Sequence, residues 1–116
     1  MTNSIDGFYS VYITGKEGQG FAIIALMAGR VVGADAAGFL LNGQYSKKDD
    51  AVSVSLSIKA PPNMPRVQGG LTGPQGEESQ LDFDMPQDFA SQNFIRIETQ
   101  HGPINAKLIK LRDLSD

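Results

Sequence analysis

The sequence predicts an all-β protein, an antiparallel meander of about eight short strands that is closed into a barrel or folded into a sandwich. Three observations lead to this prediction. Apolar and polar residues alternate with the period of a pleated strand in several segments, which recur at spacings of roughly 8–15 residues. Glycine, 13 of the 116 residues, separates these segments, and no long helical period interrupts them.

Length and composition indicate one ordinary domain covering residues 1–116. A chain of this size can bury a single core without disulfides or a structural metal. Because there is no cysteine, thiolate metal sites and cysteine nucleophiles are excluded, and a reducing compartment is expected. The net charge of −3 is unfavourable for binding nucleic acid, which requires clustered Lys and Arg.

The first six residues have neither the basic start nor the apolar stretch of a secretory signal. The most apolar window, residues 21–41, is interrupted by Arg30 and Asp35 and is rich in glycine, so it does not resemble a membrane span. We therefore expect a cytoplasmic protein that does not bind a membrane.

The first expected strand covers residues 8–14 and ends at Gly15. Residues 21–28 are apolar on both faces, which suits a strand or a short buried helix. Gly29, followed by the pair Val31-Val32, favours a hairpin over the helix. Because a segment apolar on two sides needs cover on both, and because open meanders leave strand edges, we expect a homodimer.

Residues 39–45 form a further candidate strand, although the preceding Ala-rich stretch, residues 34–38, could form one helical turn. The clearest alternation is at residues 52–58, where aliphatic and serine side chains alternate. It predicts that Val52, Val54, Leu56 and Ile58 are buried and that the three serines lie on the opposite, wet face.

Prolines and glycines interrupt the pattern between residues 61 and 76, where only residues 66–71 could be extended. Alternation returns at residues 81–85 and stops at Pro86. The last two expected strands, residues 94–99 and 104–111, are separated by the turn sequence Gln-His-Gly-Pro.

Catalytic and metal-binding patterns are absent from the sequence. The glycine-rich segments at 15–20 and 69–76 lack the spacing of nucleotide-binding loops. Asp82, Asp84 and Asp88 could ligate a hard cation, but a solvent-facing strand explains them more simply. His101, the only histidine, has no spaced nucleophile or second ligand. We expect no enzyme activity, no metal and no cofactor.

A barrel of this size can enclose one small ligand, although a filled core requires the same residue types. The sequence leaves open an intracellular carrier or sensor of a small apolar ligand. Its lining would include aromatic, methionine and aliphatic side chains, namely Phe8, Phe21, Met27, Phe39, Val54, Leu56, Phe83 and Phe94, with Met64 and Met85 as further candidates.

Four segments, residues 6–13, 18–20, 29–35 and 42–46, resemble the amino-terminal half of the GrlR-type negative regulators of type III secretion. Beyond the proline-rich stretch only the strand pattern matches. The resemblance implies a lipocalin-like β-barrel with an apolar interior. It also implies a bacterial, dimeric regulator that sequesters a transcriptional activator.

The family binds its partner through an exposed acidic run, Glu-Asp-Glu-Asp, after the fourth strand. The matching residues here are Lys47, Lys48, Asp49 and Asp50, so the first two charges are reversed and the last two are kept. The resemblance implies that these four residues bind a protein partner. The two lysines favour a partner that is less basic than the family's or of mixed charge. A solvated β-turn between two strands is by itself sufficient to explain the run.

Overall fold

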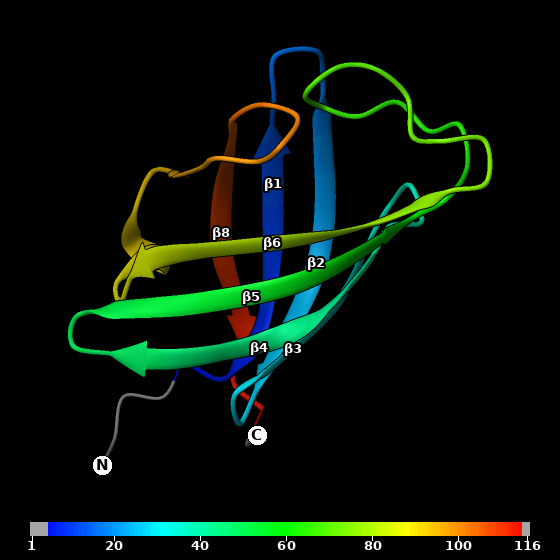
Figure 1. Cartoon of the computed structure of the whole chain (residues 1–116). Coiled ribbons are helices and arrows are strands. Elements are labelled where there is room, and N and C mark those ends of the chain that lie inside the picture. The colour runs from blue at the N-terminus through cyan, green and yellow to red at the C-terminus, as the bar shows by residue number, and fades with distance from the viewer. Residues whose placement is uncertain (1–4, 115–116) are drawn as a thin grey trace.

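The computed structural model describes residues 5–114. It confirms the predicted all-β class, because eight antiparallel strands form one meander that curls into a nearly closed barrel (Figure 1). The described elements are β1 Gly7–Thr14, β2 Gln19–Met27, β3 Arg30–Asp35, β4 Leu40–Lys48, β5 Ala51–Ala60, β6 Glu77–Pro86, the 3-10 helix η1 Phe89–Ser91, β7 Ile95–Ile97 and β8 Ile104–Arg112.

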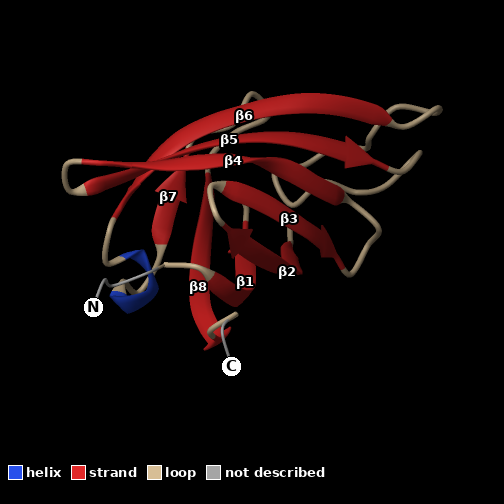
Figure 2. Ribbon diagram, turned by 90° about the horizontal axis from the view of Figure 1, so that it is seen from below, coloured by secondary structure: helices blue, strands red, loops and turns tan. Residues whose placement is uncertain are grey.

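The strand order is β6-β5-β4-β3-β2-β1-β8-β7, so β6 and β7 are the two edges of the sheet. Figure 2 shows how the sheet curls until β4, β5 and β6 lie across β8, β1 and β2. The inner surfaces of these two halves face each other and enclose the core. The barrel has a seam where its two edges, β6 and β7, are not paired with each other.

The core consists of side chains that point inward from both halves. Tyr9 and Phe89 are almost fully buried, and their ring centroids lie 5.4 Å apart. Since Phe89 belongs to η1, this short helix packs against the β1 side of the core. The other buried apolar side chains of this cluster are Val11, Ala22, Ile24, Leu26, Val31, Val52, Val54, Leu56, Met85, Ile95, Ile97, Ala106 and Leu108.

The prediction for residues 52–58 is confirmed in β5. Val52, Val54 and Leu56 are buried and Ile58 is half-buried against the core, whereas the intervening serines lie on the outer face. The register of β5 explains the pattern, because alternate residues of a strand point to opposite faces.

The hairpin predicted at Gly29 is also confirmed. Both Ala28 (φ 49°) and Gly29 (φ 88°) are left-handed, as a two-residue turn between twisted strands requires. The alternative of a helical turn after residue 33 is wrong. There β3 continues to Asp35, whose carboxylate accepts hydrogen bonds from the backbone N–H groups of Ala37 and Phe39 and closes a turn.

Several expected strand bounds differ from the structure. β4, expected at residues 39–45, continues to Lys48 because its last residues pair with the start of β5. β6 begins at Glu77 instead of Leu81, because β5 pairs with it along its whole length and the polar residues before Leu81 take part in this pairing. β7 contains only three residues, paired with β8 alone. Residues 66–71 form turns, with one isolated bridge between Pro65 and Leu71.

Candidate functional site

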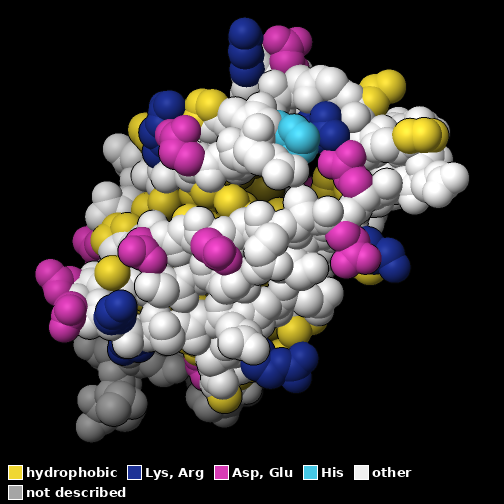
Figure 3. Space-filling model, viewed as in Figure 1, with side chains coloured by type: hydrophobic (Ala, Val, Ile, Leu, Met, Phe, Trp, Pro, Cys, Tyr) yellow, Lys and Arg dark blue, Asp and Glu magenta, His cyan; other side chains and the backbone are white. Residues whose placement is uncertain are grey.

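The barrel encloses a cavity of about 120 Å³ whose lining is entirely apolar. Val54, Leu56 and Phe83, three of the expected lining residues, contact it, together with aliphatic side chains from β1, β2 and β8. Figure 3 shows hydrophobic side chains in a hollow beside β6, where the seam of the barrel leaves the interior partly open.

The prediction that Phe8, Phe21 and Phe94 line the interior is wrong. Their exposed fractions are 38%, 36% and 53%. The physical reason for Phe8 and Phe21 is strand register, since the inward positions of β1 and β2 are those of Val11 and Ile24. Phe94 lies just before the short edge strand β7, outside the sheet.

Met27 and Phe39 lie outside the central cavity. Met27 is half-buried at the end of β2 and does not line it. Phe39 lines a second cavity of about 190 Å³, which shares Ile13, Leu41 and Ile58 with the first and is therefore adjacent to it. Most of the interior lining consists of aliphatic side chains that sequence reasoning did not select, because it favoured aromatic residues. Strand alternation was the signal that could have identified those on β5 and β6, where the other face of the strand is polar.

The size of the central cavity limits what it can hold. Sites for drug-sized ligands occupy roughly 300–1,000 Å³, whereas a dry engineered cavity of about 150 Å³ binds benzene. The cavity therefore suits one small apolar molecule or the end of an alkyl chain.

A polar cluster lies beside the second cavity, where the segment 61–76 meets β6. The Arg66 guanidinium donates hydrogen bonds of 2.8 and 2.9 Å to the two carboxylate oxygens of Glu77, and Gly73 N–H donates a third of 3.0 Å. These bonds, that from Arg66 foremost, lower the pKa of Glu77. The Nε2 atom of His101 lies 3.8 Å from Glu77. Because the cluster ties the long segment to the strand, its evident role is structural.

The outer surface of β4, β5 and β6 is polar apart from Leu40, which is 46% exposed at the start of β4. Ser53 and Ser55 donate hydrogen bonds of 2.7 Å to Asp84 and Asp82, respectively, across the β5–β6 pair. Asp88 lies beyond β6, directly before η1. Residues 5–114 contain no group of three side chains suited to hold a metal ion.

The outer surface of β8, β1, β2 and β3 has the opposite character. Six large apolar side chains on it are between 36% and 53% exposed, and we refer to them together as the apolar face: Phe8, Tyr12, Phe21, Ile23, Ile109 and Leu111. They are neighbours in the sheet. The rings of Tyr12 and Phe21 are 5.0 Å apart, and Ser10 is paired with both Ile23 and Ile109.

Of the four residues implied to bind a partner, Lys47 and Lys48 are the last residues of β4 and pair with Val52 and Ala51 of β5, and only Asp49 and Asp50 form the turn between the two strands. The solvated β-turn expected from the sequence is confirmed. Asp49 adopts a left-handed conformation (φ 56°), and Asp50 C=O accepts a hydrogen bond of 3.0 Å from Gln87 N–H. The turn is thus held to the end of β6, and Lys47, Lys48, Asp49 and Asp50 are all exposed.

Fold and surface together define a barrel-like all-β protein with an apolar interior and one apolar outer face. No family model matches the sequence, and no curated protein or solved structure matches the chain. In the described part, residues 5–114, no helix has the length and apolar character needed to cross a membrane.

Proposed function

We propose that this is a non-catalytic regulatory protein of the cytoplasm that acts by binding and sequestering a protein partner, as the GrlR-type regulators of type III secretion do. The observation that carries the proposal is the apolar face, which gathers six of the exposed large apolar side chains on one half of the outer surface. The resemblance of the amino-terminal segments to that family supports a transcriptional activator as the partner.

The contrast between the two halves explains why the apolar face indicates binding. Antiparallel sheets commonly have one face on the core and one in water, and β4, β5 and β6 follow this rule with serine, asparagine and aspartate. The outer face of β8, β1 and β2 departs from this rule because it is apolar. From their exposed fractions, the six side chains present on the order of 500 Å² of surface, which is within the range of functional patches on monomers.

We also propose that the protein is a homodimer, as both the resemblance and the strand edges suggest. The ten-residue strand β6 has a strand neighbour, β5, on one side only. Its free edge supplies unpaired backbone groups that a second copy can use. This assembly would leave the apolar face available for the partner.

Affinity capture from host cells, followed by mass spectrometry, tests the binding proposal. Wild-type protein should capture a specific partner, and Ile23→Asp/Ile109→Asp should lose it, because two carboxylates in the apolar face would be desolvated on binding. The matched control, Asn42→Asp/Ser46→Asp, adds the same charge to exposed positions of β4 and should retain the partner. Equal capture by both variants would contradict the proposal.

A second candidate function, carrier or sensor of a small apolar ligand, is favoured by the 120 Å³ cavity with its wholly apolar lining. Native mass spectrometry of the protein as purified tests it. A retained small apolar mass, lost on unfolding, would support this function, and a mass equal to the bare chain from host-expressed protein would count against it.

A further inference from the structure

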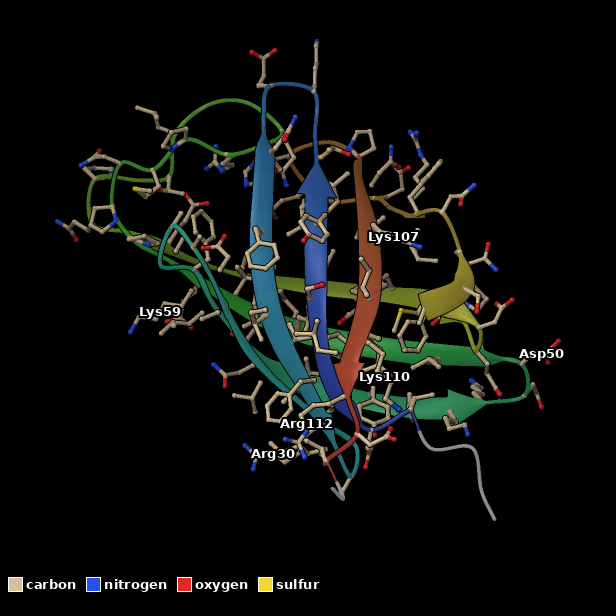
Figure 4. All side chains as sticks on the ribbon, turned by 180° about the vertical axis from the view of Figure 1, so that it is seen from behind. Arg30, Asp50, Lys59, Lys107, Lys110 and Arg112 are labelled. Carbon is tan, nitrogen blue, oxygen red and sulfur yellow. The ribbon has the colours of Figure 1, made fainter. Side chains whose placement is uncertain are left out.

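The outward strand positions of the apolar face carry positive charge only, and the nearest carboxylate beyond β8, that of Asp113, forms an ion pair with Lys110. Arg30 at the start of β3, and Lys107 and Arg112 on β8, occupy outward positions in the register of the sheet. The outward strand positions of β8, β1, β2 and β3 include no Asp or Glu, since those positions hold aromatic, aliphatic, small or amide side chains apart from these cations. Figure 4 shows Lys107 beside β8, with Arg30 and Arg112 at the lower end of the face.

We propose that the apolar face binds an amphipathic helix of an acidic partner protein, with carboxylates flanking the apolar stripe of that helix. This inference rests on the proposed function and adds the kind of partner surface that is recognised.

The dimensions of the face favour a helix. Four neighbouring strands span about 14 Å, because adjacent strands lie roughly 4.8 Å apart, and a helix with its side chains is about 10–12 Å across. An apolar sheet face is usually covered by a second layer, and a single helix fits this width. Ser10, small and 4% exposed, lies between Ile23 and Ile109 and lowers the middle of the face.

The cations of the apolar face determine the sign of the charge expected on the partner surface. Carboxylates beside the apolar stripe would lie near Arg30 and Arg112, and near Lys107, whose Nζ donates a hydrogen bond to Gln92 C=O. Their negative charge complements these cations and speeds the encounter. A second copy of the chain seated on the same face would bring cations toward cations, with no carboxylate at an outward position of these strands to pair them. The self-association proposed above therefore uses another surface.

An anionic membrane fits the face less well than a helix does. Lipid-binding basic segments typically cluster roughly four to eight Lys or Arg, whereas this face has three. Its apolar side chains also belong to a rigid sheet and are only partly exposed, so they cannot enter the acyl region as those of an interfacial helix do.

Fluorescence anisotropy with two synthetic helices tests the inference on the full chain. Both probes are 18-residue amphipathic peptides with a leucine stripe, one flanked by Glu and the other by Lys. The Glu-flanked probe should bind at least about tenfold more tightly at low salt, and the difference should shrink as salt screens the rim. Ile23→Asp should abolish binding of both probes.

Charge variants locate the contact. Arg30→Gln and Arg112→Gln should each raise the dissociation constant of the Glu-flanked probe by about threefold, as loss of one charge at the edge of an interface does. Lys59→Gln removes the same charge from the outer side of β5 and should leave the dissociation constant unchanged.

The remaining outcomes separate this inference from the proposed function. Equal affinity for the two probes, or no binding of either, would overturn the acidic helix while partner capture that depends on Ile23 would still support protein binding. Tighter binding to vesicles of phosphatidylcholine and phosphatidylserine than to the Glu-flanked probe would overturn it in favour of a membrane. If the wild-type protein binds neither probe and captures no partner, both proposals are contradicted.

Discussion

Truncation of Leu56 to alanine tests the inward register of β5, on which the barrel interior depends. Leu56 is 9% exposed, is paired with Gly43 and Leu81 in the neighbouring strands, and lines the central cavity. The substitution removes three carbon atoms, which costs roughly 2.4 kcal/mol at about 0.8 kcal/mol per buried methylene. Enlargement of the cavity adds to this transfer term, so we expect a total loss of about 3–4 kcal/mol.

Urea denaturation followed by circular dichroism measures this loss, and the melting temperature should fall by roughly 10–15 °C for a domain of this size. Ser57→Ala, the adjacent outward position on the same strand, is the control and should change the free energy of unfolding by less than about 0.5 kcal/mol. An unchanged midpoint for Leu56→Ala, or equal losses in the two variants, would refute the register.

Three further predictions concern the turn, the pH dependence and the assembly. The resemblance implies that the turn meets a basic region of the partner, distinct from the acidic helix proposed for the apolar face. Asp49→Ala/Asp50→Ala should therefore slow association with the captured partner and weaken its salt dependence, measured by surface-binding kinetics, while stability changes by less than about 0.5 kcal/mol. Burial foremost raises the pKa of Tyr9 to about 12. Because the fold favours the neutral phenol, the free energy of unfolding should stay level up to the unfolded pKa near 10 and fall by about 2 kcal/mol as the pH approaches 12. Tyr9→Phe should show a smaller fall in the same denaturation series. Light scattering at micromolar concentrations should give twice the monomer mass of 12.4 kDa.

Each of these predictions has a result that contradicts it. If Asp49→Ala/Asp50→Ala associates at the wild-type rate at every salt concentration, the turn takes no part in partner binding. An equally steep alkaline loss in Tyr9→Phe would assign the pH dependence to another group, such as Tyr45, whose pKa is also raised by burial and by its hydrogen bond to Asp6. A mass of one chain across the concentration range would exclude the homodimer.

The number of strands and their antiparallel meander could be predicted because several strands carry a period-two signal and the turns are marked by glycine and proline. The interior could be predicted only where one face of a strand is polar, as in β5. In β2 both faces are apolar, so the sequence could not show that Ile24 points inward and Ile23 outward. That choice depends on pairing with β1 and β3, which is a long-range property.

The same ambiguity concealed the candidate surface. Phe8 and Phe21 were expected inside because large aromatic side chains usually supply core volume. In the folded chain the inner positions are filled by aliphatic residues and by Tyr9 and Phe89, which leaves these two phenylalanines on the apolar face. Register, and not composition, decided between a lining residue and an interface residue.

Methyl NMR on protein labelled at isoleucine tests the central claim, binding through the outer apolar face, most directly. Ile23 and Ile109 lie on that face, whereas Ile24, Ile95 and Ile97 are buried within the barrel. On addition of the captured partner, we predict that the Ile23 and Ile109 methyl signals shift and that the interior signals stay in place. Shifts confined to the interior isoleucines would contradict the claim and indicate a ligand inside the barrel.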